Sequence, residues 1–248
     1  MWIGAGIGVL FGVVIGSFLA TVYLRWPAGQ SAAGGRSRCD GCGTPIAARS
    51  LVPLLSFALQ RGRCAACGVR IDLVHPVMEL AAAVIGGLAG AIFADRPIEA
   101  AACAVFGWQL LLLAMLDLGH RWLPDRLNLM LVGTGLAFAT LGGLEMLRDG
   151  LVGAIAGYGV LASVRWLYRR LRGREGLGGG DPKLFAAIGA WLGWAWLPWV
   201  LVGASFAGLG AAALLALPHR RFPSDMRLPL GTLLALAAWP IWIAAQQG

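Results

Sequence analysis

The sequence predicts an all-α polytopic membrane protein, with about eight transmembrane helices and a small cytoplasmic zinc-knuckle loop domain after the first helix. Of its 248 residues, 58% are hydrophobic and 13% are charged, and the mean hydropathy is +0.74. An ordinary soluble domain is about 45–50% apolar and about 25% charged. The apolar residues also fall in long blocks, and about 20 such residues make one membrane-spanning helix. This composition excludes a disordered chain, a soluble globular enzyme and a small disulfide-stapled secreted domain.

The apolar blocks number eight and lie at about 3–24, 76–94, 98–116, 127–144, 151–168, 184–197, 199–217 and 229–245. The sixth block has only fourteen residues. It makes about 21 Å of helix, against about 30 Å of hydrocarbon in a bilayer. We therefore expect two separate helices that turn at Pro198, the first of which begins inside the membrane or is locally short.

The basic residues predict the orientation of these helices. With the N-terminus outside, the cytoplasmic segments contain 18 of the 20 lysines and arginines, leaving only Arg96 and Arg148 opposite. Such an excess is the usual mark of cytoplasmic loops. The net charge of +8 therefore reflects topology and contacts with anionic membrane lipids, and we expect no nucleic-acid partner. These cytoplasmic segments are 25–75, 117–126, 165–183 and 218–228.

The first block differs from a cleaved signal peptide, because it lacks a basic leading region and is followed by Arg25. We interpret residues 1–24 as an uncleaved transmembrane helix. Residues 25–75 then form the loop domain, and residues 76–248 form a polytopic membrane domain. Within the first helix, glycines recur every four residues and share one face, which permits close contact with a second helix. They are Gly4, Gly8, Gly12 and Gly16.

Four of the five cysteines form two CxxC knuckles in the loop domain. Two residues between thiolates let one turn present both sulfurs to a single ion, and two such turns complete a closed tetrahedral site typical of structural zinc. The alternatives are two disulfides or a redox motif. A cytoplasmic location keeps thiols reduced and favours zinc, which would hold the loop together. The predicted ligands are Cys39, Cys42, Cys64 and Cys67.

Two aspartates stand at predicted cytoplasmic helix ends. Asp117 follows a leucine-rich run, and Asp181 follows three glycines and precedes the short sixth block. Carboxylates near hydrocarbon are functional candidates because they are costly there. If the glycines bring the two carboxyl groups together, the pair would share one proton. The ionised aspartate would then act as a base on water, and the protonated aspartate would act as an acid. The alternative is that they are ordinary interfacial acids paired with Arg121 or Lys183.

Several short motifs accompany these residues: GSFL (16–19), VPLLS (52–56), RGRC (61–64), HPVMEL (75–80), LPD (123–125) and GGGDPKL (178–184). Together they resemble the type IV prepilin peptidases, the bifunctional leader peptidase/N-methyltransferases, over nearly the whole chain. The last motif resembles the GxGDxKL box, which also occurs in archaeal preflagellin peptidases and presenilin-like GxGD proteases. Those relatives lack the cysteine knuckles, so the bacterial bifunctional type is favoured.

The resemblance implies that Asp117 and Asp181 are catalytic residues of an aspartic endopeptidase in the bacterial inner membrane. Its substrates would be prepilins or pseudopilins, whose short basic leaders are cut at the cytoplasmic face. The new N-terminus would then be methylated from S-adenosylmethionine. The alternative is a zinc-stapled membrane scaffold or transporter whose aspartates relay ions or protons.

The methyl-donor site is the least defined part of the sequence, because no glycine-rich turn of the soluble methyltransferase type is present. Glu79, beside the zinc loop, is the candidate cofactor-binding residue, since a carboxylate attracts the donor's sulfonium cation. The alternative is that Glu79 pairs with an arginine of the loop and only fixes its position.

Overall fold

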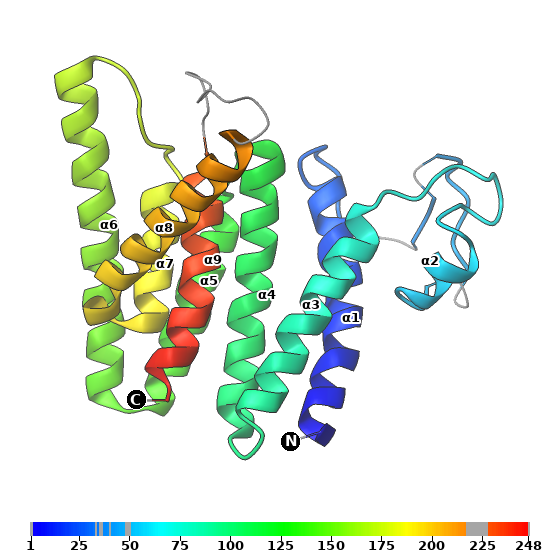
Figure 1. Ribbon diagram of the computed structural model, residues 1–248, viewed down its shortest axis with the longest axis horizontal. Helices are drawn as coiled ribbons and strands as arrows, with labels where there is room; N and C mark the ends of the chain where they lie inside the picture. The colour runs from blue at the N-terminus through cyan, green and yellow to red at the C-terminus, as the bar shows by residue number, and fades with distance from the viewer. Residues whose placement is uncertain are drawn as a thin grey trace. The chain divides into compact units, whose positions relative to one another are not determined.

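The computed structural model describes residues 2–32, 34, 37–39, 41–47, 51–216 and 228–247. This part of the chain is helical and contains no β-strand beyond two isolated bridges. Its helices, shown in Figure 1, are α1 (Trp2–Arg25), α2 (Leu55–Leu59), α3 (Val74–Ile92), α4 (Pro97–His120), α5 (Asp125–Leu141), α6 (Leu144–Arg172), α7 (Asp181–Leu192), the 3₁₀ turn η2 (Trp194–Trp196), α8 (Leu197–Ala216) and α9 (Leu230–Ala245).

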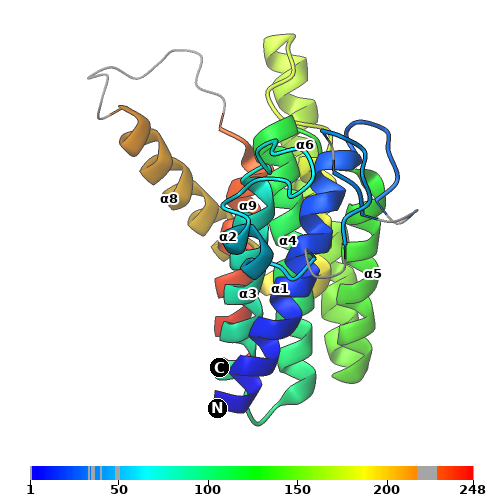
Figure 2. The same cartoon turned by 90° about the vertical axis from the view of Figure 1, so that its right-hand side faces the viewer.

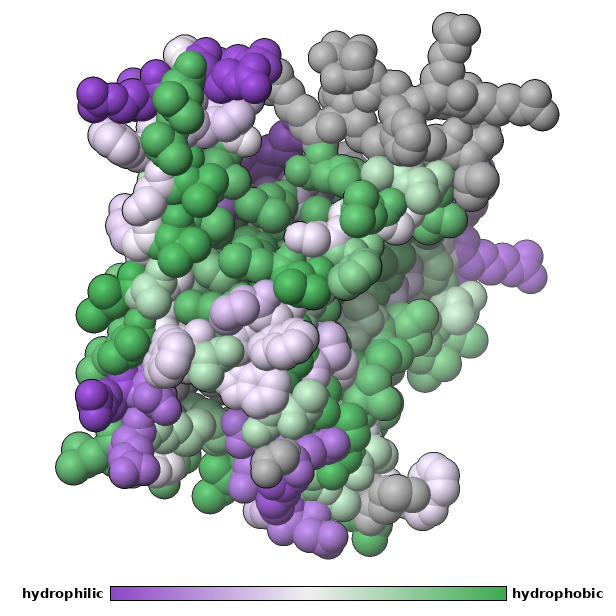
Figure 3. Space-filling view, turned by 60° about the vertical axis from the view of Figure 1, so that its left-hand side comes forward, coloured by the Kyte–Doolittle hydropathy of each residue, from purple (hydrophilic) through white to green (hydrophobic). Residues whose placement is uncertain are grey.

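The predicted all-α class is confirmed, since every predicted apolar block coincides with a helix. Five helical segments are long and apolar enough to cross a bilayer: α1, α3, α4, α6 and Trp194–Leu215. On the face shown in Figure 3, hydrophobic residues form a broad band between hydrophilic groups above and below. These features suggest a multi-pass membrane protein, whereas the full count of eight crossings stays a prediction.

The chain divides into two compact units, Met1–Leu112 and Leu113–Gly248, so that α4 contributes to both. In the first unit, α1 and α3 lie side by side (Figures 1 and 2). A Cβ atom on Gly8 would collide with Gly86 O, and one on Gly12 would collide with Ala82 O. The predicted role of the glycine face in close helix contact is therefore confirmed. The predicted division at residues 24 and 75 stays a prediction.

In the second unit, α7 packs against α5, α6 and α9. Ten of its twelve residues are buried. Glycines let α6 approach it closely, because a Cβ atom on Gly153 would collide with Gly189 O, and one on Gly157 would lie 2.6 Å from Phe185 O. The Trp191 indole N–H also donates a hydrogen bond to Leu131 O of α5 (2.9 Å). Helix α7 is thus packed against other helices along its length.

The predicted turn at Pro198 is wrong. Helix α7 ends at Leu192, and the chain turns at Gly193, whose φ of 77° is easily adopted only by glycine. Pro198 instead lies in the first turn of α8, where its missing N–H would have had no helical partner. The prediction of two separate helices is correct, and the first begins at Asp181, three residues before the predicted block.

The close packing of α1 against α3 can be tested with a matched pair of substitutions. Gly8→Ala should lower the thermal unfolding temperature in detergent, because its Cβ collides with the α3 backbone. Gly6→Ala is the control, since nothing lies within 4 Å of the added Cβ and alanine favours a helix by about 1 kcal/mol over glycine. Equal unfolding temperatures for the two variants would contradict the packing.

Candidate active site and metal cluster

Asp117 lies in the last turn of α4 and is 7% exposed. Its Oδ2 accepts a hydrogen bond from the backbone N–H of Thr232 (2.8 Å). The Thr232 hydroxyl lies 3.3 Å from the same oxygen and 3.0 Å from Ala114 O, so its single hydrogen can serve either acceptor. A Cβ atom on Gly231 would lie 2.8 Å from Asp117 Oδ2. The start of α9 therefore holds the Asp117 carboxylate and needs glycine to approach it.

Asp181 is the first residue of α7 and is 6% exposed. Its Oδ2 accepts a hydrogen bond from the backbone N–H of Gly178 (3.0 Å), and a Cβ atom there would lie 2.9 Å from that oxygen. A Cβ atom on Gly179 would lie 3.3 Å from Arg165 Nη1 of α6. Because glycine has no Cβ atom, Gly178 can lie close to the Asp181 carboxylate and Gly179 can lie close to the Arg165 guanidinium.

Leu123 connects the surroundings of the two aspartates. A Cβ atom on Gly180 would lie 2.6 Å from Leu123 Cβ, and one on Gly231 would lie 2.9 Å from Leu123 Cδ1. The charges of Asp117 and Arg165 both act on Asp181, and the charge of Arg121 acts on Asp117. The second unit thus brings Asp117 and Asp181 together at the ends of two helices.

The basic side chains near this site have other partners. Lys183 Nζ donates to both carboxylate oxygens of Asp125 (2.6 and 2.7 Å), and Arg165 pairs with Glu175 (3.2 Å). Within the described residues, neither Asp117 nor Asp181 forms a salt bridge. Lys183, one of the two basic residues in the predicted alternative, is therefore paired with another acid, whereas the charge of Arg121 acts on Asp117. The alternative of a pair with Arg121 stays a prediction.

The four knuckle cysteines form one cluster in the first unit, with their sulfur atoms within 4.8 Å of one another. Each knuckle is a tight turn: Gly43 N–H donates to Cys39 O (2.8 Å), and Gly68 N–H donates to Cys64 O (2.9 Å). The glycines have φ of 69° and 72°, which explains why glycine follows each knuckle. The cluster could bind a metal ion.

The electrostatics of the cluster suit a cation. The hydrogen bond with the Thr44 side chain holds the pKa of the Cys42 thiol at about 6. The backbone N–H of Val69 lowers the pKa of the Cys67 thiol, but its contacts with Cys42 and the other thiols raise it to about 11. Crowded sulfurs thus resist becoming thiolates together, and a bound divalent cation would remove that repulsion.

Glu79 is buried in α3, and its Oε2 accepts a hydrogen bond from the backbone N–H of Leu54 (2.7 Å). Leu54 has a φ of 57°, a conformation that is strained for a leucine. Glu79 therefore fixes the position of the loop, as one of the two sequence interpretations expected. Its partner is a backbone N–H rather than an arginine.

Comparisons with known proteins identify the family of this chain. A profile of the type IV leader peptidase family matches residues 104–213, and one of the bacterial peptidase A24 N-terminal domain matches residues 10–93. The prepilin leader peptidase/N-methyltransferase of Aeromonas hydrophila is 41% identical, over 82% of this chain and 70% of the relative. This chain belongs to the prepilin leader peptidase/N-methyltransferase family. Proteins of the same name from Burkholderia pseudomallei and Pseudomonas aeruginosa are 39% and 34% identical, over 92% and 93% of this chain and 81% and 87% of the relatives.

No solved structure gives a significant match. The resemblance found in the sequence is thus confirmed as prepilin leader peptidase/N-methyltransferase family membership. Both aspartates fall within the leader peptidase profile, whereas Glu79 and the four cysteines fall within the N-terminal domain profile.

Three contacts at these sites were missed by the sequence analysis. Thr232 and Gly231 follow Asp117 by more than a hundred residues, and Arg165 lies on a different helix from Asp181. Single threonines and arginines form no pattern of their own. The proline before α9, together with Gly231, is the only local signal of a close approach, as Pro229 directly precedes the helix.

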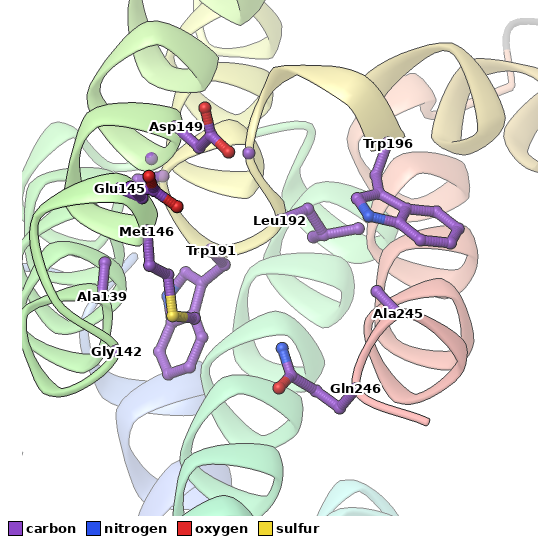
Figure 4. A pocket seen from close by; sticks show the side chains of 13 residues that line it. Ala139, Gly142, Glu145, Met146, Asp149, Trp191, Leu192, Trp196, Ala245 and Gln246 are labelled. Atoms are coloured by element: carbon purple, nitrogen blue, oxygen red, sulfur yellow. The ribbon is translucent and has the colours of Figure 1, made fainter. Parts of the chain in front are cut away.

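A cavity of about 340 Å³ lies at the opposite end of α7 from Asp181 (Figure 4). Its walls include the carboxylates Glu145 and Asp149 of α6 and the indoles of Trp191 and Trp196. Because these residues lie at the far ends of their helices, the cavity is separate from the aspartate site of this prepilin peptidase family member.

Proposed function

We propose that this chain cleaves the leader of a prepilin or pseudopilin, with Asp117 and Asp181 as the catalytic pair, and then methylates the new N-terminus. The observation that supports the peptidase best is the pair itself. Two buried carboxylates lie at helix ends whose surroundings meet at Leu123, and each is oriented by a backbone N–H. Neither forms a salt bridge among the described residues. Such pairs share a proton and divide the roles of acid and base.

In the proposed reaction, the ionised aspartate takes a proton from water while the oxygen of that water attacks the carbonyl carbon of the scissile bond. The protonated aspartate gives its proton to the carbonyl oxygen. The tetrahedral intermediate then collapses, the C–N bond breaks, and the leaving amine takes up a proton. Thr232 and Gly178 hold the two carboxylates in place through these steps.

We propose that the site faces the cytoplasm of a bacterium, across its inner membrane, with the N-terminus outside. The last turn of α6 carries Arg169, Arg170 and Arg172, and the chain passes directly from there to Asp181. Arginine-rich ends are retained in the cytoplasm, where an uncleaved leader also remains. The predicted cytoplasmic segment 218–228 lies, except for Leu228, outside the described residues.

The dyad is tested by changing each aspartate separately. Asp117→Asn and Asp181→Asn keep the shape of the side chain but remove its proton chemistry. Since acid–base catalysis contributes about 10²–10⁴-fold, each variant should cleave a purified prepilin in detergent at least about a hundredfold more slowly. Asp125→Asn is the control, because Asp125 is an exposed partner of Lys183, and its loss should be milder. A near wild-type rate in either variant would remove the proposed dyad.

We propose that the metal of the cysteine cluster is zinc, bound by Cys39, Cys42, Cys64 and Cys67. Four thiolates in a closed set are a typical structural zinc site. The surrounding loop has few helical contacts of its own, with α2 as its one short helix among the described residues. When bound, the metal would supply folding free energy to this loop rather than reaction chemistry.

Zinc analysis of the purified protein should give about one ion per chain, as expected for one closed four-thiolate site. The double variant Cys39→Ser, Cys64→Ser should lose it and become more sensitive to proteolysis between residues 51 and 73. Cys103→Ala is the matched control, because Cys103 is buried in α4 outside the cluster. If the double variant retained its zinc, the assignment would be wrong.

We propose that S-adenosylmethionine binds beside Glu79. One carboxylate oxygen of Glu79 already holds Leu54, and the negative charge remains available to attract the sulfonium. When bound, S-adenosylmethionine would supply the methyl group to the new N-terminal amine, and Glu79 would hold the donor by attracting its sulfonium.

Two substitutions separate the roles of Glu79. Glu79→Gln keeps an oxygen that can accept from Leu54 but removes the charge, so it should raise the KM for S-adenosylmethionine while leaving leader cleavage unchanged. Glu79→Ala removes both features and should also loosen the loop. Labelled methyl transfer and cleavage are measured on the same prepilin. A wild-type KM in Glu79→Gln would leave only the positioning role.

A further inference from the structure

Asn128 is the only asparagine among the 248 residues, and it lies in the first turn of α5. It is 3% exposed, and neither its amide nitrogen nor its carbonyl oxygen bonds to any other group in the described part of the chain. Burying an amide without partners is costly. Polar side chains inside a membrane bundle are therefore expected to serve a function.

The position of Asn128 follows from the contacts on either side of it. It shares the buried face of α5 with Leu131, Gly135 and Ala139, and Leu131 O accepts from the Trp191 indole of α7. On the other side, the Asp125 carboxylate accepts from Lys183 of α7. Asn128 thus lies against α7 between Lys183 and Trp191, roughly one and a half helical turns from Asp181 at the start of that helix.

These contacts limit what can reach the amide. Because α5 and α7 are fastened above and below Asn128, a peptide or a lipid chain could not enter without separating the helices. A water molecule is small enough, and it both donates and accepts hydrogen bonds. Buried waters commonly occupy such sites, where they bond to polar groups that lack a protein partner.

We propose that Asn128 holds a water molecule beside the aspartate pair and that this water supplies the hydrolysis. The proposal rests on the peptidase function proposed above. Each cleavage consumes one water. Leu116, next to Asp117 in the chain, and Leu184, one turn after Asp181, are fully buried apolar side chains that give water no partner. Asn128 is therefore a positioning residue, which acts on the reaction through the water it binds.

The proposal is tested on the full-length protein in lipid nanodiscs with a purified prepilin. Asn128→Leu removes the amide and fills its space, so kcat should fall about tenfold, the loss expected for one hydrogen bond. The KM should stay unchanged, and the unfolding temperature should stay equal or rise. Asn128→Ser keeps a hydroxyl and leaves room for water, so it should retain most of the wild-type kcat. Thr134→Val is the control on the same helix, since that hydroxyl donates to Met130 O and Leu131 O of α5 itself.

Three outcomes would overturn the proposal: a wild-type kcat in Asn128→Leu, an equal loss in the Leu and Ser variants, or a rise in KM alone. A second measurement does not depend on activity. Because the chain has one asparagine, labelling with ¹⁵N-asparagine gives a single side-chain amide signal in the NMR spectrum. Magnetisation from water protons should be transferred to this amide. No transfer would exclude the water. Transfer in a protein that fails to cleave prepilin would refute the proposed function but retain the water site.

Discussion

The aspartate site depends on the burial of α7 by protein. A helix of twelve residues is about 18 Å long and cannot cross about 30 Å of hydrocarbon. In a bilayer at least one of its ends would therefore lie at a depth where lipid offers no hydrogen bonds, and only protein contacts can satisfy it. The α6 glycines and the α5 contacts provide this cover. Asp181 can begin a helix there because the chain folds back over it through Gly178.

The loop that carries the cysteine cluster is ordered by different interactions. The described part of this segment contains two short knuckle turns and one helix of five residues, which bury little apolar surface. Its order depends on the sulfur cluster and on the hydrogen bond from Leu54 to Glu79. One site in this chain is therefore built by helix packing, and the other by ligands and a single buried carboxylate.

Much of this arrangement could be predicted from local patterns. Long apolar runs specify helices, CxxC pairs specify a metal cluster, and a glycine run before an aspartate indicates a sharp bend. The turn between α7 and α8 was placed at Pro198, because proline is a strong breaker, although proline is also well suited to the first turn of a helix. Gly193 makes the turn instead.

The contacts of Thr232 and Leu54, and the burial of Asn128, could not be predicted in this way. Each depends on an element distant in sequence: Thr232 follows Asp117 by 115 residues, and Leu54 precedes Glu79 by 25. A single polar residue in an apolar helix looks the same in sequence whether it faces lipid, another helix or a buried site.

The Asp125–Lys183 pair has a consequence for motion along α7. Its side chains are 71% and 42% exposed, and exposed ion pairs contribute only about 0–1 kcal/mol and weaken with salt. The opposite end of α7 is held by buried aromatic rings, with Trp191 stacked on Phe138 at 5.7 Å. Local opening therefore costs less at the first turn than at the last. The helix is therefore rigid where it touches the bundle's interior and most easily loosened at the end that carries Asp181.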